Sequence, residues 1–593
     1  MPGLHVSRHG GRGKAMQFFL RGFDAVHGAD LAVEVDGVPL NEPGNVHAHG
    51  YLDLYLLPAA LIRGLTLSPG PRRAEDGDFA VAGTAQFDLG LEDPGLWTEL
   101  GGGTDRSLFG TATYRPVRGD PATFLVADTD VGQGIGDARE WRQLRLAGGW
   151  GKDLGATRVH GWVLAYDGRF ESPGVVREDD VQQGEIDFLG AYPGSGGGRS
   201  SRVLTAATLA GGDAERAWRL TAYAGGRTLT LTQNYTGAYA RPETGDGSTQ
   251  TSRALTGGAR GWWSHRLGSR ARLRTGADLR ADRVSLDEDL VRTDGSVWQD
   301  GAPYEAVLAR ASVRASVPTE PFGWLWVEPG LHTALFTVAP ARSPVALAPV
   351  LAPNAAATFF PQAPVTGRLA YARGFRSPDP RGVGDDGTVT VATADSAEAG
   401  LQLNPVPALA LRMVAFATAV SDEVVFDHVE ARYLASGATL RRGLDGGIAL
   451  QPRDHLRLSV DATLSDGRYT DSGARIPYAP TQIYVASVQT ERWSVGPLQL
   501  TGGLRGWHLA ARPLPDGFAS PSATVVDATA RVDGERWRAS LNVDNLLGAE
   551  WWDGTFVYPS NWTGRAGSSE LPVRHITAGA ARSIRLSVGW RFR

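Results

Sequence analysis

The feature that most limits how this chain can fold is an alternation of apolar and polar residues that recurs from about residue 97 to the end. Near the C-terminus the even-numbered positions are apolar, and the residues between them are polar or small; the apolar set is Ile584, Leu586, Val588, Trp590 and Phe592. Successive side chains of a β-strand point to opposite faces, so this pattern predicts a strand with one apolar and one polar face. A helix would spread the same residues around its axis.

The same alternation recurs in segments 270–280 and 455–464. Long polar connections rich in Gly, Pro, Asp and Ser are expected at residues 240–254, 285–301 and 378–390, whereas other connections are short. Short turns at one end and long loops at the other are typical of an outer-membrane β-barrel.

A soluble β-sandwich array and a β-propeller would also alternate. A propeller should repeat about every 40 to 50 residues, and no such period is visible. A sandwich array should break into linkers, and no change in composition marks them after residue 97. The polar face of segment 270–280 carries Arg270, Arg272, Arg274, Asp278 and Arg280. Such charges are costly in a dry sandwich core and ordinary in a solvated lumen, so we predict an all-β transmembrane barrel.

The amino-acid composition excludes several other classes of protein. Cysteine is absent, which excludes disulfides, thiolate metal sites and cysteine nucleophiles. The formal net charge is −5, and both signs are interspersed, unlike the basic surface of a nucleic-acid-binding protein. No stretch approaches the roughly 18 apolar residues of a transmembrane helix, and we recognise no secretory signal at the N-terminus.

Residues 1–96 do not follow the alternating pattern and are expected to form a separate small α+β domain, leaving residues 97–593 for the barrel. A β-rich run at 31–35 is followed by a turn at Asp36-Gly37. Residues 58–63 predict a short helix, and strands are expected near 65–67 and 80–89.

Short motifs in residues 1–96 resemble the plug domain of TonB-dependent outer-membrane receptors. In that family an R-G-F element, a D-G-V-P-x-N turn and a closing G-D-x-A-x-A-G segment follow in order. The matching residues here are Arg21, Gly22 and Phe23, then Asp36, Gly37, Val38, Pro39 and Asn41, then Gly77, Asp78, Ala80, Ala82 and Gly83. Segments 371–382 and 542–554 resemble the family's barrel. Each piece is weak by itself, but the ordered set spans nearly the whole chain.

The resemblance implies a barrel of about 22 antiparallel strands with a plug inside. It also implies a receptor, monomeric and without a cofactor, in the outer membrane of a Gram-negative bacterium. Such a receptor binds a scarce solute, expected to be a ferric siderophore or a similar metal chelate, and imports it with energy from a TonB-type protein. A signal peptide, a TonB box and the first plug strands are not recognisable, so we expect the N-terminal part of the plug to be missing. The chain ends on Arg593, whereas a terminal aromatic residue is usual.

His47 and His49, together with Tyr51, form the candidate ligand-binding set. Imidazole is a common ligand of transition metals, but metal sites use about three or four protein ligands and no third one is recognisable nearby. We therefore predict no metal site. The family places this segment in a plug loop where it could contact the solute, and a hydrogen-bonded structural turn is the alternative.

Six aromatic residues are expected in girdles at the membrane interfaces: Trp262, Trp263, Trp551, Trp552, Trp590 and Phe592. The lumen arginines Arg270, Arg272 and Arg274 are expected to pair with plug carboxylates, with attraction of an anionic solute as the alternative. No nucleophile–base–acid set is recognisable, so an enzyme is not expected. Two other functions stay open: a passive or degenerate pore of the same fold, and a secreted soluble β-rich carbohydrate-binding protein.

Overall fold

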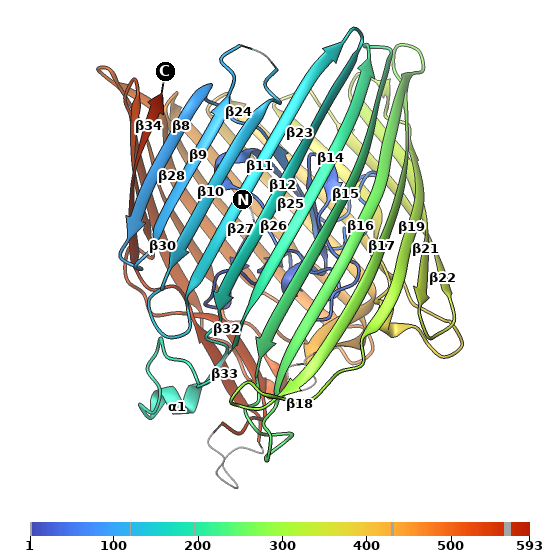
Figure 1. The fold of residues 1–593 in the computed structure, drawn as a ribbon. Coiled ribbons are helices and arrows are strands. Elements are labelled where there is room, and N and C mark those ends of the chain that lie inside the picture. The colour runs from blue at the N-terminus through green and yellow to red at the C-terminus, as the bar shows by residue number, and fades with distance from the viewer. Residues whose placement is uncertain (1–2, 119, 195, 428–431, 563–570, 593) are drawn as a thin grey trace.

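The computed structural model describes residues 3–118, 120–194, 196–427, 432–562 and 571–592. Within these ranges, 22 long antiparallel strands close into one barrel around an N-terminal plug (Figure 1). Nearly every strand pairs with the next one along the chain, and the last strand, β34, pairs with the first, β8, to complete the ring. Closure gives every backbone donor and acceptor in the membrane a partner, which lipid cannot supply. The predicted barrel of about 22 strands is confirmed.

The long barrel strands have the following bounds: β8 Gly95–Gly103, β9 Leu108–Arg115, β10 Phe124–Gly132, β11 Trp141–Leu154, β12 Thr157–Glu171, β14 Gly196–Gly212, β15 Arg216–Gln233, β16 Gly247–Arg266, β17 Arg272–Val291, β19 Tyr304–Ser316, β21 Leu325–Pro340, β22 Ala346–Phe359, β23 Val365–Arg376, β24 Ala392–Val406, β25 Leu409–Asp427, β26 Arg432–Arg453, β27 Leu456–Tyr469, β28 Gln482–Val495, β29 Leu498–Leu509, β30 Ala523–Asp533, β31 Trp537–Asp544 and β34 Ser583–Phe592. Two short strands, β18 (Val297–Gln299) and β20 (Thr319–Phe322), extend hairpins at the barrel ends.

The two faces of the strands divide as the alternation predicts. On β34, Leu586 is 60% exposed while its neighbour Ser587 is 5% exposed and faces the lumen. Most other barrel strands contribute an exposed aliphatic residue to the same outer belt, for example Leu100, Leu125, Val163, Leu255, Leu279, Leu331, Leu351, Leu369, Met413, Leu444 and Val460. A continuous exposed apolar belt fits contact with lipid and is the opposite of what a soluble β-rich protein shows.

The two ends of the barrel differ, and we name them the short-turn end and the long-loop end. At the short-turn end, residues 155–156, 407–408 and 454–455 join strands directly. The long-loop end holds α1 (Glu178–Gln182), the 3-10 turns η3 (Pro380–Gly382) and η4 (Pro515–Gly517), and a small sheet of β13 (Val176–Arg177), β33 (Val573–Ala578) and β32 (Trp552–Tyr558) (Figure 1). In the described part of the chain, no helix is long and apolar enough to cross a membrane.

Two of the expected loops are partly strand. Residues 247–254 belong to β16 and residues 285–291 belong to β17, where they form one regular ladder with each other. Polar residues such as Thr249 and Glu288 can extend a hairpin beyond the apolar belt, because water rather than lipid surrounds the strands there. Composition therefore assigned to each loop some residues that continue the strands.

The plug lies inside the barrel and consists of short strands and 3-10 turns: β1 (Leu4–Ser7), β2 (Gln17–Leu20), β3 (Phe23–Ala25), η1 (Val26–Gly28), β4 (Leu31–Val35), β5 (Val38–Pro39), η2 (Ala59–Leu61), β6 (Ile62–Pro69) and β7 (Gly83–Leu89). They form the sheets β1-β2-β3 and β5-β4-β7-β6. The strand expected at 31–35 is present as β4. The helix expected at 58–63 is only the turn η2, because β6 begins at Ile62 and pairs with β7.

The plug motifs form turns and hydrogen-bonded junctions. Asp36 and Gly37 both have positive φ, at 47° and 83°, and join β4 to β5. The Asn41 side chain accepts a hydrogen bond from the Val33 N–H at 2.8 Å and donates to the Leu31 carbonyl at 2.9 Å. These contacts fix the loop that carries His47 and His49. The first barrel strand follows the plug at Gly95, close to the expected boundary between residues 96 and 97.

Candidate functional site

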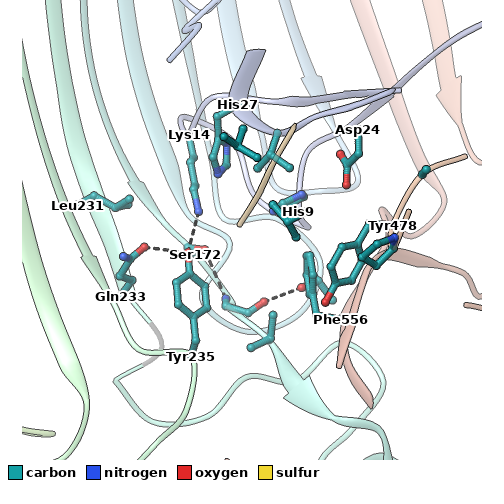
Figure 2. A pocket seen from close by; sticks show the side chains of 18 of the residues that line it. His9, Lys14, Asp24, His27, Ser172, Leu231, Gln233, Tyr235, Tyr478 and Phe556 are labelled. Carbon is teal, nitrogen blue, oxygen red and sulfur yellow. Dashed lines mark hydrogen bonds between the residues drawn. The ribbon is translucent and has the colours of Figure 1, made fainter. Parts of the chain in front are cut away.

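A cavity lies at the long-loop end, between the plug and the loops at that end, and we call it the mouth cavity (Figure 2). Plug side chains line one wall: His9, Lys14, Asp24 and His27. Loop and strand residues line the other, among them Gln233, Tyr235, Tyr478 and Phe556. On the side away from the plug, buried apolar residues from several connections pack together, namely Val175, Tyr478, Leu514, Phe556, Val557 and Tyr558. The described loop residues therefore place an apolar cluster on one side of the cavity, opposite the polar plug residues.

Lys14 supplies the mouth cavity with a cation that no carboxylate neutralises among the described residues. Its Nζ donates to the Tyr235 hydroxyl at 3.2 Å (Figure 2). Burial lowers the pKa of Lys14 to about 7, because the ammonium loses water and no opposite charge replaces it. An anionic group entering the cavity would supply the missing opposite charge.

The other charged groups of the cavity are compensated. Glu423 accepts from Arg441 Nη1 at 2.6 Å, so that these two charges cancel. Asp24 accepts from Gln17 Nε2 at 2.5 Å, and burial raises its pKa to about 7, which favours the neutral acid. Lys14 therefore dominates the electrostatics of the cavity.

The predicted ligand set lies deeper in the barrel than the mouth cavity and does not line it. His47 and Tyr51 are fully buried and His49 is 7% exposed. His49 contacts the backbone oxygens of Pro43 and Ser377, at 3.0 and 2.7 Å. The Tyr51 hydroxyl accepts from the Ala15 N–H at 2.9 Å. His27, which contacts His47, lines the cavity, and direct contact of His47, His49 and Tyr51 with a solute stays a prediction.

His27 and His47 face each other with their Nε2 atoms 3.0 Å apart. The Nδ1 atom of His27 lies 2.9 Å from the Ala15 carbonyl oxygen, and that of His47 lies 3.0 Å from Gln250 Oε1. The Gln250 amide nitrogen donates to Glu288, and this hydrogen bond orients the amide oxygen of Gln250 towards His47. Each Nδ1 atom needs a hydrogen to donate to its oxygen partner, and the contact between the two Nε2 atoms needs a third hydrogen. All three contacts can therefore be hydrogen bonds only if one of the two imidazoles is protonated.

Desolvation, followed by the charge of Lys14, lowers the pKa of both His27 and His47 well below the ordinary value. Two neutral imidazoles therefore leave one of the three contacts without a hydrogen. Protonation at low pH would supply that hydrogen but would place a positive charge in a buried site. Within the described ranges, no three His, Asp or Glu side chains are grouped as metal ligands would be.

Ion pairs fix the plug to the barrel wall. Arg21 contacts Glu398 at 2.5 Å and Asp445 at 2.6 Å. Further pairs join the plug carboxylates to barrel arginines: Asp30–Arg376 at 2.6 Å, Glu34–Arg260 at 2.6 Å, Asp78–Arg310 at 3.5 Å, and Glu42–Arg227. Most of these side chains are buried, so each partner is needed to neutralise the other.

The three lumen arginines predicted to pair with the plug lie elsewhere. Arg274 pairs with Glu328 of the barrel at 3.3 Å, and Arg272 and Arg270 donate to barrel groups near the short-turn end. Arg272 and Arg274 line a cavity together with the plug residue Glu75, but no ion pair joins these arginines to a plug carboxylate among the described residues. The arginines that do pair with the plug lie further along the strands, where the plug fills the lumen.

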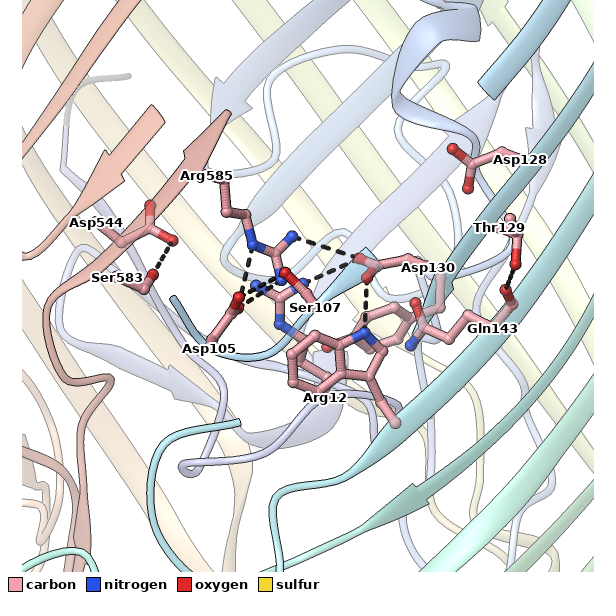
Figure 3. Close-up of polar contacts among 12 residues, drawn as sticks. Arg12, Asp105, Ser107, Asp128, Thr129, Asp130, Gln143, Asp544, Ser583 and Arg585 are labelled. Carbon is pink, nitrogen blue, oxygen red and sulfur yellow. Dashed lines mark hydrogen bonds and ion pairs between the residues drawn. The ribbon is translucent and has the colours of Figure 1, made fainter. Parts of the chain in front are cut away.

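A second network ties the N-terminal segment of the plug to β10, β11 and β34 (Figure 3). Asp130 accepts from Arg12 at 3.1 Å and from the Trp141 indole nitrogen at 2.8 Å. Arg585 lies between Asp130 and Asp105, at 3.5 and 2.7 Å. Positive and negative charges balance here, unlike at Lys14. The adjoining cavity, lined by Arg8, Arg139, Asp527 and Asp553, carries both signs of charge as well.

The candidate girdle residues divide into three groups. Trp263, Trp590 and Phe592 are exposed on the outer face near the short-turn end, together with Trp150, Trp324, Trp493 and Trp537. Trp262 is the neighbour of Trp263 on β16, so it points into the lumen and lines a cavity there. Trp551 packs on Trp507 with ring centroids 5.0 Å apart, and Trp552 packs on Phe188 at 4.5 Å. Both belong to the long connection after β31 and do not face lipid.

Two sequence-family models match this chain. The one described as "TonB dependent receptor-like, beta-barrel" matches residues 64–546, and the "TonB-dependent Receptor Plug Domain" matches residues 1–84. The chain belongs to the TonB-dependent receptor family. Membership implies a Gram-negative outer membrane, and the family consists of receptors and transporters rather than enzymes.

Solved structures of other receptors share the whole fold. Similar ones are the ferric citrate transporter FecA in the unliganded form (TM-score 0.81, 13% identity), the ferric yersiniabactin uptake receptor FyuA from Yersinia pestis (0.79, 12%) and the siderophore receptor PiuA from Acinetobacter baumannii (0.75, 15%). Each covers 100% of this chain, and this chain covers 93%, 94% and 93% of them. At these identities the likeness establishes the fold of this TonB-dependent receptor and not its solute.

The residues of the mouth cavity were missed by reasoning from the sequence. Tyr235, Tyr478 and Phe556 come from three connections far apart in the chain. One signal was available: Lys14 and Lys152 are the only lysines among 59 basic residues. An arginine keeps its proton almost anywhere, whereas a buried lysine can lose it, so a rare lysine in the plug marks a position worth testing.

Proposed function

We propose that this receptor binds a scarce anionic metal chelate, such as a ferric siderophore, in the mouth cavity and imports it across the outer membrane. The observation that carries the proposal is Lys14, a cation without a carboxylate partner in the described structure, at the floor of a cavity at the long-loop end. In barrels of this kind the long loops face the outside of the cell.

The lining of the cavity supports this class of solute. Tyr235, Tyr478 and Phe556 offer aromatic surface for the organic part of a chelate, and Lys14 offers a charge-assisted hydrogen bond to a carboxylate or phenolate oxygen. The similar proteins are a ferric citrate transporter, a ferric yersiniabactin uptake receptor and a siderophore receptor. Solutes of this kind combine a metal with oxygen ligands that carry negative charge.

Import requires the plug to move, because it fills the lumen and is held by buried and partly buried ion pairs. We infer that a TonB-type protein of the inner membrane supplies the force. Pulling on the plug would break contacts in an order-to-disorder step of the kind used by other switching proteins. The loops around the mouth cavity must part first to admit the solute from outside.

Uptake of labelled ferric chelates by iron-limited cells, compared with cells in iron-replete medium, tests the proposal. Binding to the purified receptor should be measured on the same chelates. Lys14→Gln should weaken binding about 10- to 100-fold, the range expected for losing one hydrogen bond to a charged group. Lys14→Arg keeps the charge and serves as the matched control. If Lys14→Gln binds the chelate as tightly as the natural protein, the mouth cavity is not the binding site.

Conductance separates import from a passive pore. A plugged receptor in planar bilayers should pass little steady current, because the plug occupies the lumen. A large steady current through the purified protein would instead favour the pore.

A further inference from the structure

The plug meets the barrel wall through two chemically different surfaces. The first, which we call the polar seam, joins plug residues Glu34 and Asp78 to Arg260, Asp278, Arg310 and His332 on β16, β17, β19 and β21. The second, the apolar seam, joins plug residues Leu40 and Leu56 to Val126, Trp162, Leu164 and Ala206 on β10, β12 and β14. The two seams lie on different arcs of the barrel.

Two cavities follow one another along the polar seam towards the short-turn end. The inner one is lined by Arg260, Asp278, Arg310 and Ser312 of the barrel and by plug residues around Asp76. The outer one lies a few residues further along the same strands, at Trp262, Arg274 and Arg314. Glu75 of the plug lines both cavities. The plug segment 71–79, which we call the strap, therefore separates the inner cavity from the short-turn end.

The strap is a self-contained turn attached to the barrel by polar contacts. Asp76 accepts from the backbone N–H groups of Arg72 and Arg73, at 2.7 and 2.9 Å, and this turn stays intact if the strap moves as a unit. Its contacts with the wall include Arg72–Glu398 at 2.9 Å, Asp78–Arg310 at 3.5 Å, and the contact of His332 with the Asp76 carbonyl at 3.2 Å. Asp78 also accepts from the Ser377 N–H at 2.7 Å and forms a backbone bridge with Phe375.

Buried polar atoms around the inner cavity have spare hydrogen-bonding capacity. Glu75 Oε2, Arg310 Nε and His332 Nε2 have no hydrogen-bond partner among the described protein groups. A polar solute or water passing along this seam can satisfy them, and water can rehydrate the ion pairs once they part. Opening the apolar seam would instead expose Trp162, Leu164 and similar side chains to water with no compensation.

We propose that the solute leaves the barrel along the polar seam, by displacement of the strap, while the apolar seam stays closed. The route rests on the proposed import function, but the order in which the seams open is a property of the resting protein. It can therefore be tested both during import and without it.

Single cysteines report the opening of each seam, because the chain has no cysteine of its own. Ser312→Cys places a thiol in the polar seam, and Ala206→Cys is the matched control in the apolar seam. The two positions are 6% and 5% exposed, so both start buried. Cells that import a ferric chelate are treated with a small sulfonated maleimide, and the labelled fraction is measured by mass spectrometry.

During import, labelling of Ser312→Cys should rise about fivefold or more, as expected for a local opening, while Ala206→Cys stays at its resting rate. Labelled Ser312→Cys protein should lose uptake and keep its binding of the chelate at the mouth. An Ala206→Cys rate that rises as much, or uptake without any rise at Ser312→Cys, would overturn the proposal.

The second arm uses the purified receptor in detergent and increasing urea. Ser312→Cys should become reactive at a lower urea concentration than Ala206→Cys, and the reverse order would overturn the proposed route. If cells import no chelate while Ser312→Cys still reacts first in urea, the import function fails and the order of opening stands.

Discussion

The polar and apolar seams show how one plug can be both tightly held and releasable. On the apolar side, Leu164 is fully buried against plug residues and contributes through area removed from water. On the polar side, Arg260 lies between Glu34 and Asp278 at 2.6 and 2.8 Å. Apolar contacts do not depend on direction and weaken gradually as the two surfaces separate. A buried ion pair, in contrast, is strong only while water is excluded from it. Different chemistry on the two sides allows the plug to open preferentially on one of them.

The largest effect is expected from breaking the polar seam at a single residue. Arg260→Ala removes the cation shared by the partly buried Glu34 and the buried Asp278, and should destabilise the plug by about 3 to 5 kcal/mol. Urea unfolding of the purified receptor, followed by protease sensitivity of the plug, measures this. Arg199→Ala removes an exposed pair with Asp167 and should change stability by less than about 0.5 kcal/mol. Equal effects of the two variants would contradict a stabilising role for Arg260 in the polar seam.

Replacing both partners sharpens the comparison, because it turns part of the polar seam into apolar surface. The double variant Glu34→Leu/Arg260→Leu should recover much of the stability that Arg260→Ala loses. Position 34 then carries no charge, and Asp278 keeps its ion pair with Arg314. Uptake should nevertheless fall, because the seam would then resist entry of water. A double variant that imports at the normal rate would argue that the charges have no part in opening.

Truncation in the apolar seam should cost slightly less. Leu164→Ala creates a cavity and is expected to lower stability by about 2 to 5 kcal/mol in the same urea assay. Leu164→Met, which nearly conserves volume, should cost less than about 1.5 kcal/mol. The seam comparison predicts that Leu164→Ala raises labelling of Ala206→Cys in urea. If only Ser312→Cys responded, the two seams would not be independent.

Binding at the mouth should depend on pH in a defined direction. Because the pKa of Lys14 is lowered to about 7, its positive charge is lost as the pH rises through that value. Affinity for an anionic chelate should therefore fall between pH 7 and about pH 8.5, allowing for a bound anion that raises the lysine pKa. Lys14→Arg should flatten the profile, as measured by isothermal titration. A flat profile for the natural protein would contradict the role of Lys14.

The same titration bears on stability. The unfolded chain gives Lys14 its ordinary pKa of 10.5, so the folded state binds its proton less tightly than the unfolded state does. The lysine therefore disfavours folding at neutral pH, and this penalty declines as the pH rises from about 7 towards 10.5. Lys14→Met should remove the penalty and raise stability at pH 7.

The smallest effects are expected on the outer surface. Brominated lipid should quench Trp263, which faces outwards, and leave Trp262, which faces the lumen, almost unaffected. Single-tryptophan replacement by Phe at each position would assign the two signals, with little change in stability because surface substitutions usually cost less than about 0.5 kcal/mol. Equal quenching at both positions would contradict the alternation along β16.

Much of the fold could be predicted because a barrel strand is described by local rules. The alternation at 583–592 gave both the strand and its lipid-facing side. The division between Trp262 and Trp263 was also present in the sequence, since adjacent strand residues face opposite sides. The candidate site was harder. His47 and His49 were selected for their chemistry, but a neighbouring loop and the barrel wall bury them below the cavity.

Local patterns in the sequence were enough to predict the barrel, its apolar belt, the plug motifs and the family, because each follows from a period of two or from a short ordered pattern. Only the tertiary structure decided which charges meet. Arg260 and Glu34 are 226 residues apart, and Lys14 reaches Tyr235 across 221 residues. Closing the barrel brings such residues together, and no local pattern encodes the register between a plug and the wall that surrounds it.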